Sequence, residues 1–199
     1  MAAEVRLFTV EDLELFRDND DRYEVIEGEL YVSRAPHVEH QLVLDQTTTS
    51  LNIWHARTGF GLVVSGAGVI FSRHDGVIPD LMWFGEERLA GALINPETGE
   101  WDGHFYAAPD LAIEVLSPGH ANETRDREVK LTLYSRRGVR EYWIIDRFTK
   151  TIAVFRRTEW AALALVATLT DRDTLTSPLL PDFAVPVAQL FRLPDALRR

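Results

Sequence analysis

The stretch DLAIEVLSPG, residues 110–119, has the residue pattern of a strand of Leu, Ala, Ile and Val that carries the carboxylate of Glu114 in its middle. Side chains alternate between the two faces of a strand, so Glu114 shares its face with Ala112 and Leu116. Both faces are otherwise apolar, which is typical of a central strand covered on both sides. A buried carboxylate costs on the order of several kcal/mol of desolvation unless it is paired or bound to a cation. The fold must therefore cover this strand and supply a partner for its charge.

The rest of the chain alternates strand-like and helix-like segments. Residues 23–33, YEVIEGELYVS, predict a tight hairpin, and the helical spacing of apolar residues predicts a helix over 37–57 with His40 facing inward. The remaining predicted elements are a strand meander over 61–66, 67–72 and 77–85, a short helix over 86–91, an irregular segment over 92–108, a helix over 122–138, strands over 139–146, 150–157 and 159–169, and a closing segment with one helical turn over 179–191. Two helices against one mixed sheet give an α/β (α+β) sandwich. No linker divides it, so we predict one domain over residues 1–199.

The composition is that of an ordinary globular chain without disulfides. It has no cysteine and no run of 18 apolar residues, so we expect a soluble cytoplasmic protein with no membrane partner. The net charge of -10 argues against a protein that coats nucleic acid in general, because affinity for phosphates comes mainly from Lys and Arg. An acidic protein can still carry a local positive face. The basic residues are in fact clustered, at Arg125, Arg127, Lys130, Arg136, Arg137 and Arg140, followed by Arg147, Lys150, Arg156 and Arg157.

A second carboxylate repeats the anomaly of Glu114. Asp80 follows Pro79 at the start of the apolar run LMWF. Two carboxylates on neighbouring strands, with no obvious basic partner, repel each other and raise a pKa, and a divalent cation between them removes that conflict. Magnesium and manganese prefer sites with one or two carboxylates, water and substrate phosphates. The pair therefore predicts metal-dependent phosphodiester chemistry with Mg²⁺ or Mn²⁺.

One lysine supports this hypothesis. The chain has 19 Arg but only two Lys, Lys130 and Lys150. A lysine on the helix after Glu114 indicates a position where a compact ammonium is needed to hold an attacking water or a developing oxyanion. Asp126, Lys130 and Tyr134 follow each other at four-residue spacing, so they share one face of that helix.

These motifs, in this order, carry a family resemblance. The sequence IPD, then DLAIEVLSP, then a helix with D...K...Y and finally GVREYWIID resembles the Uma family of endonucleases, a branch of the PD-(D/E)XK restriction-endonuclease-like superfamily. The resemblance extends from the hairpin at 23–33 to the tail at 179–191. It implies a mixed sheet flanked by helices, acidic residues that bind Mg²⁺ or Mn²⁺, and a lysine that assists hydrolysis of DNA.

The resemblance assigns the first acid of the motif to Asp80 and the second to Glu114. The superfamily pattern then places a lysine two residues after Glu114, but Leu116 stands there. In this branch the lysine function corresponds to Lys130 on the following helix. Nucleases of this type commonly border the cleft with their first helix, which brings in His40, and they often act as homodimers.

Each assignment has a structural alternative. Asp80 could end a turn, and Glu114 could pair with an arginine. Lys130 and Asp126 could form an exposed ion pair, and His40 could be a satisfied core residue. Tyr134 is interpreted as packing. We expect the possible accessory residues of the site to be His40, Asp126 and Glu24.

The leading hypothesis is a metal-dependent DNA endonuclease in which Asp80 and Glu114 hold the metal and Lys130 assists the water. The candidate contacts to DNA phosphates are Arg125, Arg127, Arg136 and Arg137. The acidic net charge and the missing lysine at 116 leave a second hypothesis open, a binding module for nucleic acid or protein that has lost cleavage. A third is a glycoside hydrolase with Asp80 and Glu114 as general acid and base.

Overall fold

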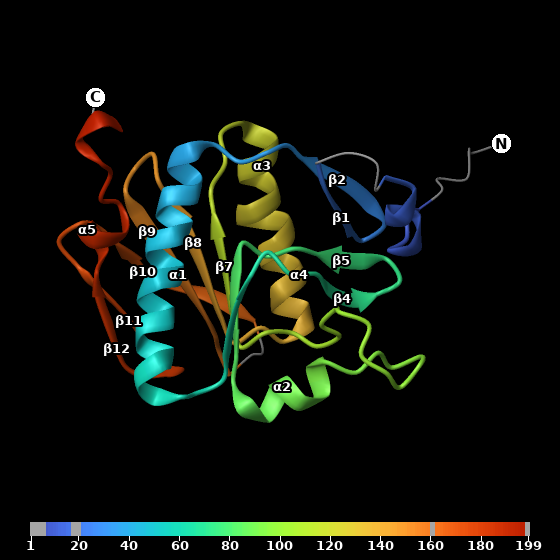
Figure 1. Cartoon of the computed structure of the whole chain (residues 1–199). Helices are drawn as coiled ribbons and strands as arrows, with labels where there is room; N and C mark the ends of the chain where they lie inside the picture. The colour runs from blue at the N-terminus through green and yellow to red at the C-terminus, as the bar shows by residue number, and fades with distance from the viewer. Residues whose placement is uncertain (1–6, 17–20, 160–161, 198–199) are drawn as a thin grey trace.

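The computed structural model of the chain describes residues 7–16, 21–159 and 162–197. Its centre is a six-stranded sheet with strand order β10-β9-β8-β7-β6-β3 (Figure 1). The strands are β3 (Leu62–Ser65), β6 (Leu81–Phe84), β7 (Leu111–Val115), β8 (Glu141–Asp146), β9 (Thr151–Arg157) and β10 (Leu163–Leu169). Neighbours β7 and β8 run parallel and the other pairs run antiparallel, so the sheet is mixed, as predicted. Residues 160 and 161 of the predicted strand 159–169 lie outside the described residues.

A parallel pair of strands needs a crossover connection, which is usually helical. Between β7 and β8 the chain forms α3 (His120–Thr124), the π-helical turn η2 (Arg125–Val129) and α4 (Lys130–Arg137). Gly138 ends α4 with a left-handed φ of 91°, a conformation that glycine adopts without strain. The helix predicted over 122–138 is therefore confirmed, with a π turn inside it.

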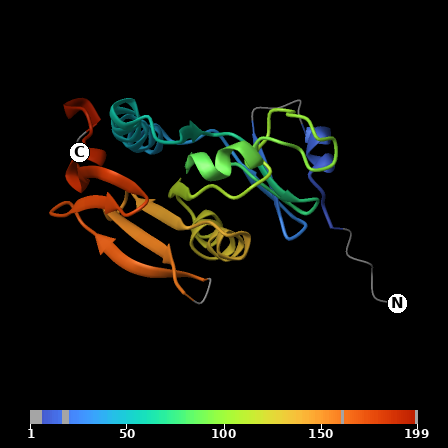
Figure 2. The same ribbon diagram turned by 90° about the horizontal axis from the view of Figure 1, so that it is seen from below.

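Helices cover both faces of the sheet, as Figures 1 and 2 show. On one face, Leu51 of α1 (Val38–Thr58) belongs to an apolar cluster that includes Ile113. On the other face, Leu133 of α4 belongs to a second apolar cluster that includes Ala112. β7 is therefore buried on both faces, as the alternation of its side chains predicts.

The predicted meander over 61–85 is wrong. β4 (Val69–Ser72) and β5 (Asp75–Val77) do not belong to the large sheet. With β1 (Arg22–Ile26) and β2 (Glu29–Ser33) they form a separate antiparallel sheet of order β2-β1-β5-β4. β3 pairs with β6 instead. The predicted strand 77–85 contains only the last residue of β5, Val77, then a break at 78–80 and then β6. The prediction of one sheet is corrected to a large sheet with two smaller ones. The reason is long-range pairing, because Val25 of β1 lies opposite Gly76 of β5.

The segment predicted as irregular, 92–108, begins at the last residue of α2 (Glu86–Ala92) and packs against the small sheet. The backbone NH of Ile70 donates to the carbonyl of Phe105 at 2.8 Å, and the backbone NH of Phe105 donates to the carbonyl of Gly68 at 3.0 Å. The Phe105 ring stacks on Phe84 at 4.5 Å between centroids. These contacts fix the segment to β4 and to the core of the large sheet.

Short elements complete the described chain. They are the 3-10 turn η1 (Glu11–Phe16), the hairpin of β11 (Thr174–Ser177) and β12 (Leu180–Pro186), the helical turn α5 (Val187–Leu190) and the 3-10 turn η3 (Asp195–Leu197). The closing segment and helical turn predicted over 179–191 correspond to β12 and α5. None of the helices in the described ranges combines the length and the apolar character that crossing a bilayer requires.

Candidate active site

The two anomalous carboxylates lie side by side on neighbouring strands. Leu81 pairs with Ile113 in an antiparallel register, which places Asp80 opposite Glu114. The backbone NH of Val115 donates to Oδ2 of Asp80 at 2.9 Å. Both acids are buried, with 4% and 3% of their surface exposed. Sheet pairing therefore brings together the two residues that the sequence singled out.

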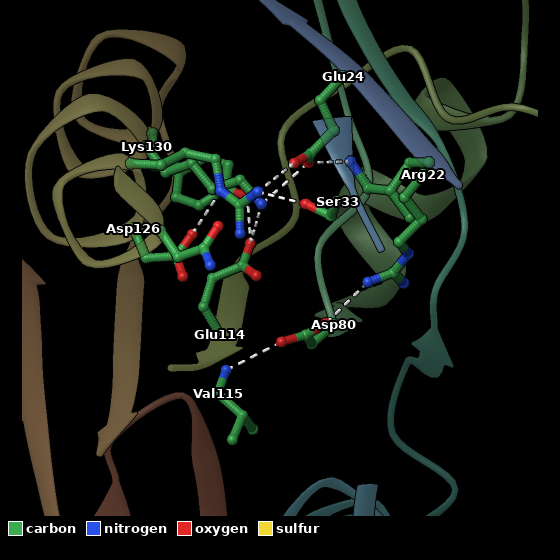
Figure 3. Close-up of polar contacts among 12 residues, drawn as sticks. Arg22, Glu24, Ser33, Asp80, Glu114, Val115, Asp126 and Lys130 are labelled. Carbon is green, nitrogen blue, oxygen red and sulfur yellow. Dashed lines mark hydrogen bonds and ion pairs between the residues drawn. The ribbon is translucent and has the colours of Figure 1, made fainter. Parts of the chain in front are cut away.

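Lys130 stands between two carboxylates at the start of α4 (Figure 3). Its Nζ lies 2.9 Å from Oε1 of Glu114 and 2.9 Å from Oε1 of Glu24, which extends from β1 of the small sheet. The lysine is 1% exposed. The alternative of an exposed ion pair with Asp126 does not hold, because both side chains are buried. The ammonium instead links the small sheet to the large one.

Asp80 is held by two basic side chains that come from other elements. Nη1 of Arg22 donates to Oδ1 at 2.9 Å, and Nε2 of His40 lies 3.1 Å from Oδ2. The expectation that the acids lack basic partners is therefore wrong for Asp80 and for Glu114 alike. Sequence reasoning missed Arg22, although the alternation of β1 places it on the same face as Glu24.

The second acid of the helix, Asp126, binds an arginine rather than Lys130. Nε of Arg125 donates to Oδ1 of Asp126 at 3.0 Å, and its Nη1 lies 3.9 Å from Oε2 of Glu24 and bonds Ser33. Arg125 is 8% exposed, so it stabilises the buried acids and does not present its guanidinium to a phosphate on the surface. The π turn η2 carries both residues, and π turns are frequent at functional sites.

The other three predicted phosphate contacts lie nearer the surface. Each already has a carboxylate partner: Arg127 pairs with Asp146, Arg136 with Glu27 and Arg137 with Asp75. Their side chains are one third to two thirds exposed.

The pKa values of the two central acids, Glu114 and Asp80, are shifted in opposite directions. Burial, the largest cause, raises the pKa of Glu114 to about 8; the charge of Lys130 opposes this rise, and the charges of Asp80 and of the other nearby acids add to it. Burial also raises the pKa of Asp80, but the hydrogen bond and charge of His40 and the Val115 amide outweigh it, so the pKa lies far below its usual range. Burial lowers the pKa of His40, yet its bond to Asp80 raises it overall. Of the two acids, Glu114 is therefore the one that takes up a proton more readily, and Asp80 is the one that stays ionised.

We expect the stability of the metal-free protein to fall as the pH rises from 4.5 to about 8. The pKa of Glu114 is higher in the folded state than the ordinary value, so the folded state binds more protons in this window. Its contribution is complete below the unfolded pKa and is lost as the pH passes the folded one. Urea unfolding at a series of pH values measures this slope. Glu114→Gln should flatten it, and an unchanged slope in that variant would contradict the assignment.

Tyr134 contacts the site directly, which the sequence-based interpretation as packing did not foresee. Its hydroxyl donates to Oε1 of Glu114 at 2.9 Å, whereas the hydroxyl of the neighbouring Tyr142 donates to the backbone carbonyl of Asp126. The two rings pack edge to face at 5.0 Å between centroids. Tyr134 therefore orients the carboxylate of Glu114.

We expect Tyr134→Phe and Tyr142→Phe to lose a similar stability, about 1 kcal/mol each, because each deletes one buried hydrogen bond. Under the endonuclease hypothesis of the sequence analysis, only Tyr134→Phe should lower DNA cleavage, by about tenfold, because it alone releases Glu114 from its orientation. Thermal unfolding and plasmid nicking of both variants check this. Equal nicking by the two variants would restore the packing interpretation.

The donor chemistry of the acids fits a hard divalent cation. Within residues 7–16, 21–159 and 162–197, no three His, Asp or Glu residues form a group that could hold a metal by themselves. Asp80 and Glu114 nevertheless offer adjacent carboxylates from two paired strands, and magnesium is usually bound by one or two carboxylates completed by water and phosphate. A cation at this pair would compete with protonation of Glu114 and would displace some of the hydrogen bonds that Asp80 accepts.

Comparisons with known proteins identify the family and support the fold of the chain. The sequence matches the family model Uma2, described as "Putative restriction endonuclease", over residues 9–188. The fold is similar to the crystal structure of a "putative nuclease belonging to DUF820" from Anabaena variabilis ATCC 29413, with a TM-score of 0.71 and 19% identity over 92% of this chain and 97% of the other. The comparison with curated proteins gave no match. The mixed sheet flanked by helices and the match over most of the sequence lead to one conclusion: the chain belongs to the Uma2 family, the family described as putative restriction endonucleases.

Proposed function

We propose that this protein is a divalent-metal-dependent endonuclease that hydrolyses phosphodiester bonds of DNA. The observation that carries the proposal is the position of Lys130, whose ammonium lies 2.9 Å from Glu114 while Asp80 lies across the strand pair. Lys130 contacts Glu114, and the strand register places Asp80 opposite Glu114. The family described as putative restriction endonucleases supports DNA as the substrate.

The chemistry follows from the charges of the cluster. Asp80 and Glu114 would hold Mg²⁺ or Mn²⁺, which when bound polarises the scissile phosphate and lowers the pKa of a bound water. Lys130 supplies a positive charge beside Glu114 that can orient the attacking water and stabilise the charge that develops in the transition state. Glu24 holds the ammonium from the other side, and His40 orients Asp80.

The departure from the superfamily pattern does not leave the site without a lysine. Leu116 is fully buried in the apolar cluster on the α4 side of the sheet. Lys130 reaches Glu114 from α4 on the same side. The helix thus provides the ammonium that the strand position 116 does not.

Plasmid nicking tests the proposal. Supercoiled DNA should be nicked by the wild-type chain in Mn²⁺ or Mg²⁺ and left intact in a chelator. Glu114→Gln should abolish nicking while it keeps the fold, since a neutral Gln resembles the protonated carboxyl. Nicking that survives in the chelator, or in Glu114→Gln, would overturn the proposal.

A specific observation favours a second candidate, a binding module that has lost cleavage. Glu24, Asp80 and Glu114 are each less than 5% exposed, and each contacts a basic side chain. Such a network can serve stability alone. In that case the thermal unfolding temperature would not respond to Mn²⁺, whereas a metal site that binds only the folded state raises it.

A further inference from the structure

Arg22 differs from the other members of the cluster in its exposure. Its side chain is 37% exposed, whereas those of Asp80 and Lys130 are 6% and 2% exposed. It nevertheless donates to Oδ1 of Asp80 at 2.9 Å. Arg22 therefore connects the buried acids to solvent.

The surroundings of Arg22 leave space on its outer side. Arg22 lines a cavity of about 680 Å³ between η1, the small sheet and the segment 92–108. Gly66 lies beside the guanidinium, and a Cβ at this position would stand 3.3 Å from its Nη2.

We propose that Arg22 neutralises Asp80 in the metal-free protein and contacts a phosphate of the DNA once a divalent cation has taken its place on Asp80. The inference rests on the proposed function, because it names the substrate-phosphate contact of the same site. Asp80 oxygen Oδ1 accepts from Arg22, while Oδ2 is held by His40 and the Val115 amide. Of the two oxygens, Oδ1 is therefore the one whose partner has room to leave. A guanidinium beside a cation-bound carboxylate is repelled by the cation and attracted to a phosphate.

The proposal predicts opposite effects on two affinities, which a purely structural arginine would not produce. In Arg22→Gln, Mn²⁺ should bind about tenfold more tightly, because one positive charge next to the site is gone. Binding of a short DNA duplex, measured by fluorescence anisotropy in Ca²⁺, should weaken. The slope of log affinity against log salt should fall by about one, the value for one lost phosphate contact.

Arg140→Gln is the matched control. Arg140 is half exposed and pairs with the buried Asp110 at 3.2 Å, at the opposite end of β7 from Glu114. It should leave both affinities unchanged.

The outcomes separate this inference from the proposed function. If the wild type binds Mn²⁺ and nicks DNA, but Arg22→Gln matches Arg140→Gln in both affinities, the inference is overturned and the nuclease remains. Weaker Mn²⁺ binding in Arg22→Gln would also overturn it, since it would show that Arg22 supports the metal site. If the wild type binds no metal, both the function and the inference fall.

Discussion

Lys130→Met is expected to lower the free energy of unfolding at pH 8 by about 3–5 kcal/mol, the cost of leaving buried carboxylates without their cation. The ammonium is shared by Glu114 and Glu24, so its removal leaves two carboxylates facing each other in the core. One of them has to take up a proton, and the loss should therefore shrink as the pH falls. Chemical unfolding at pH 8 and pH 5 measures the difference.

The same variant should lose DNA cleavage by about 100-fold or more, the usual cost of removing a group that stabilises transition-state charge. The chain offers one matched control, since Lys150 is its only other lysine and lies exposed in the turn between β8 and β9. Lys150→Met should keep both stability and cleavage. The double variant Glu24→Gln, Lys130→Met should recover part of the stability but none of the cleavage. Full cleavage by Lys130→Met would remove the lysine from the mechanism.

Asp80→Asn is expected to abolish Mn²⁺ binding and to cost about 2–4 kcal/mol of stability. The carboxylate accepts hydrogen bonds from Arg22, His40 and the Val115 amide, and an amide cannot replace the charge that holds the two basic side chains. Calorimetric titration and urea unfolding give the two quantities on the same samples.

A variant of a second buried aspartate distinguishes the loss of Mn²⁺ binding from the loss of stability. Asp110, at the start of β7, is 2% exposed and accepts from Arg88, Arg140 and the Gly85 amide. Asp110→Asn should therefore lose a similar stability but keep Mn²⁺ binding and nicking. Loss of metal binding in both variants would mean that the effect comes from general loosening of the fold.

The sequence predicted the elements that local pattern controls. Alternation along 111–116 predicted a strand buried on both faces, and the spacing of Asp126, Lys130 and Tyr134 predicted that they share one helix face. The structure agrees on both, because the period of a strand or a helix fixes which side chains share a face. The inward position of His40 followed in the same way, and it lies 3.1 Å from Asp80.

Local sequence patterns could not predict which segments distant in the sequence pair in the fold. A strand pattern gives the face of each side chain but not the partner strand, so β4 was predicted in the wrong sheet, and β5 was not predicted as a strand of its own. The partners of the acids could not be predicted for the same reason. Arg22 is 58 positions from Asp80, and Lys130 is 106 positions from Glu24, so only the tertiary fold brings these residues together. The raised pKa of Glu114 likewise depends on four elements meeting in the core.

The proposed function depends on a divalent-metal site at Asp80 and Glu114. Calorimetric titration of Mn²⁺ into the wild-type chain and into Glu114→Gln at pH 8 tests it most directly, because this variant keeps the shape and polarity of the side chain. The account predicts saturable binding by the wild type, with release of a proton from Glu114 that grows as the pH is lowered, and no binding by the variant. Equal heats of binding for the two proteins, or none for the wild type, would show that Glu114 is a structural charge held by Lys130 and Tyr134.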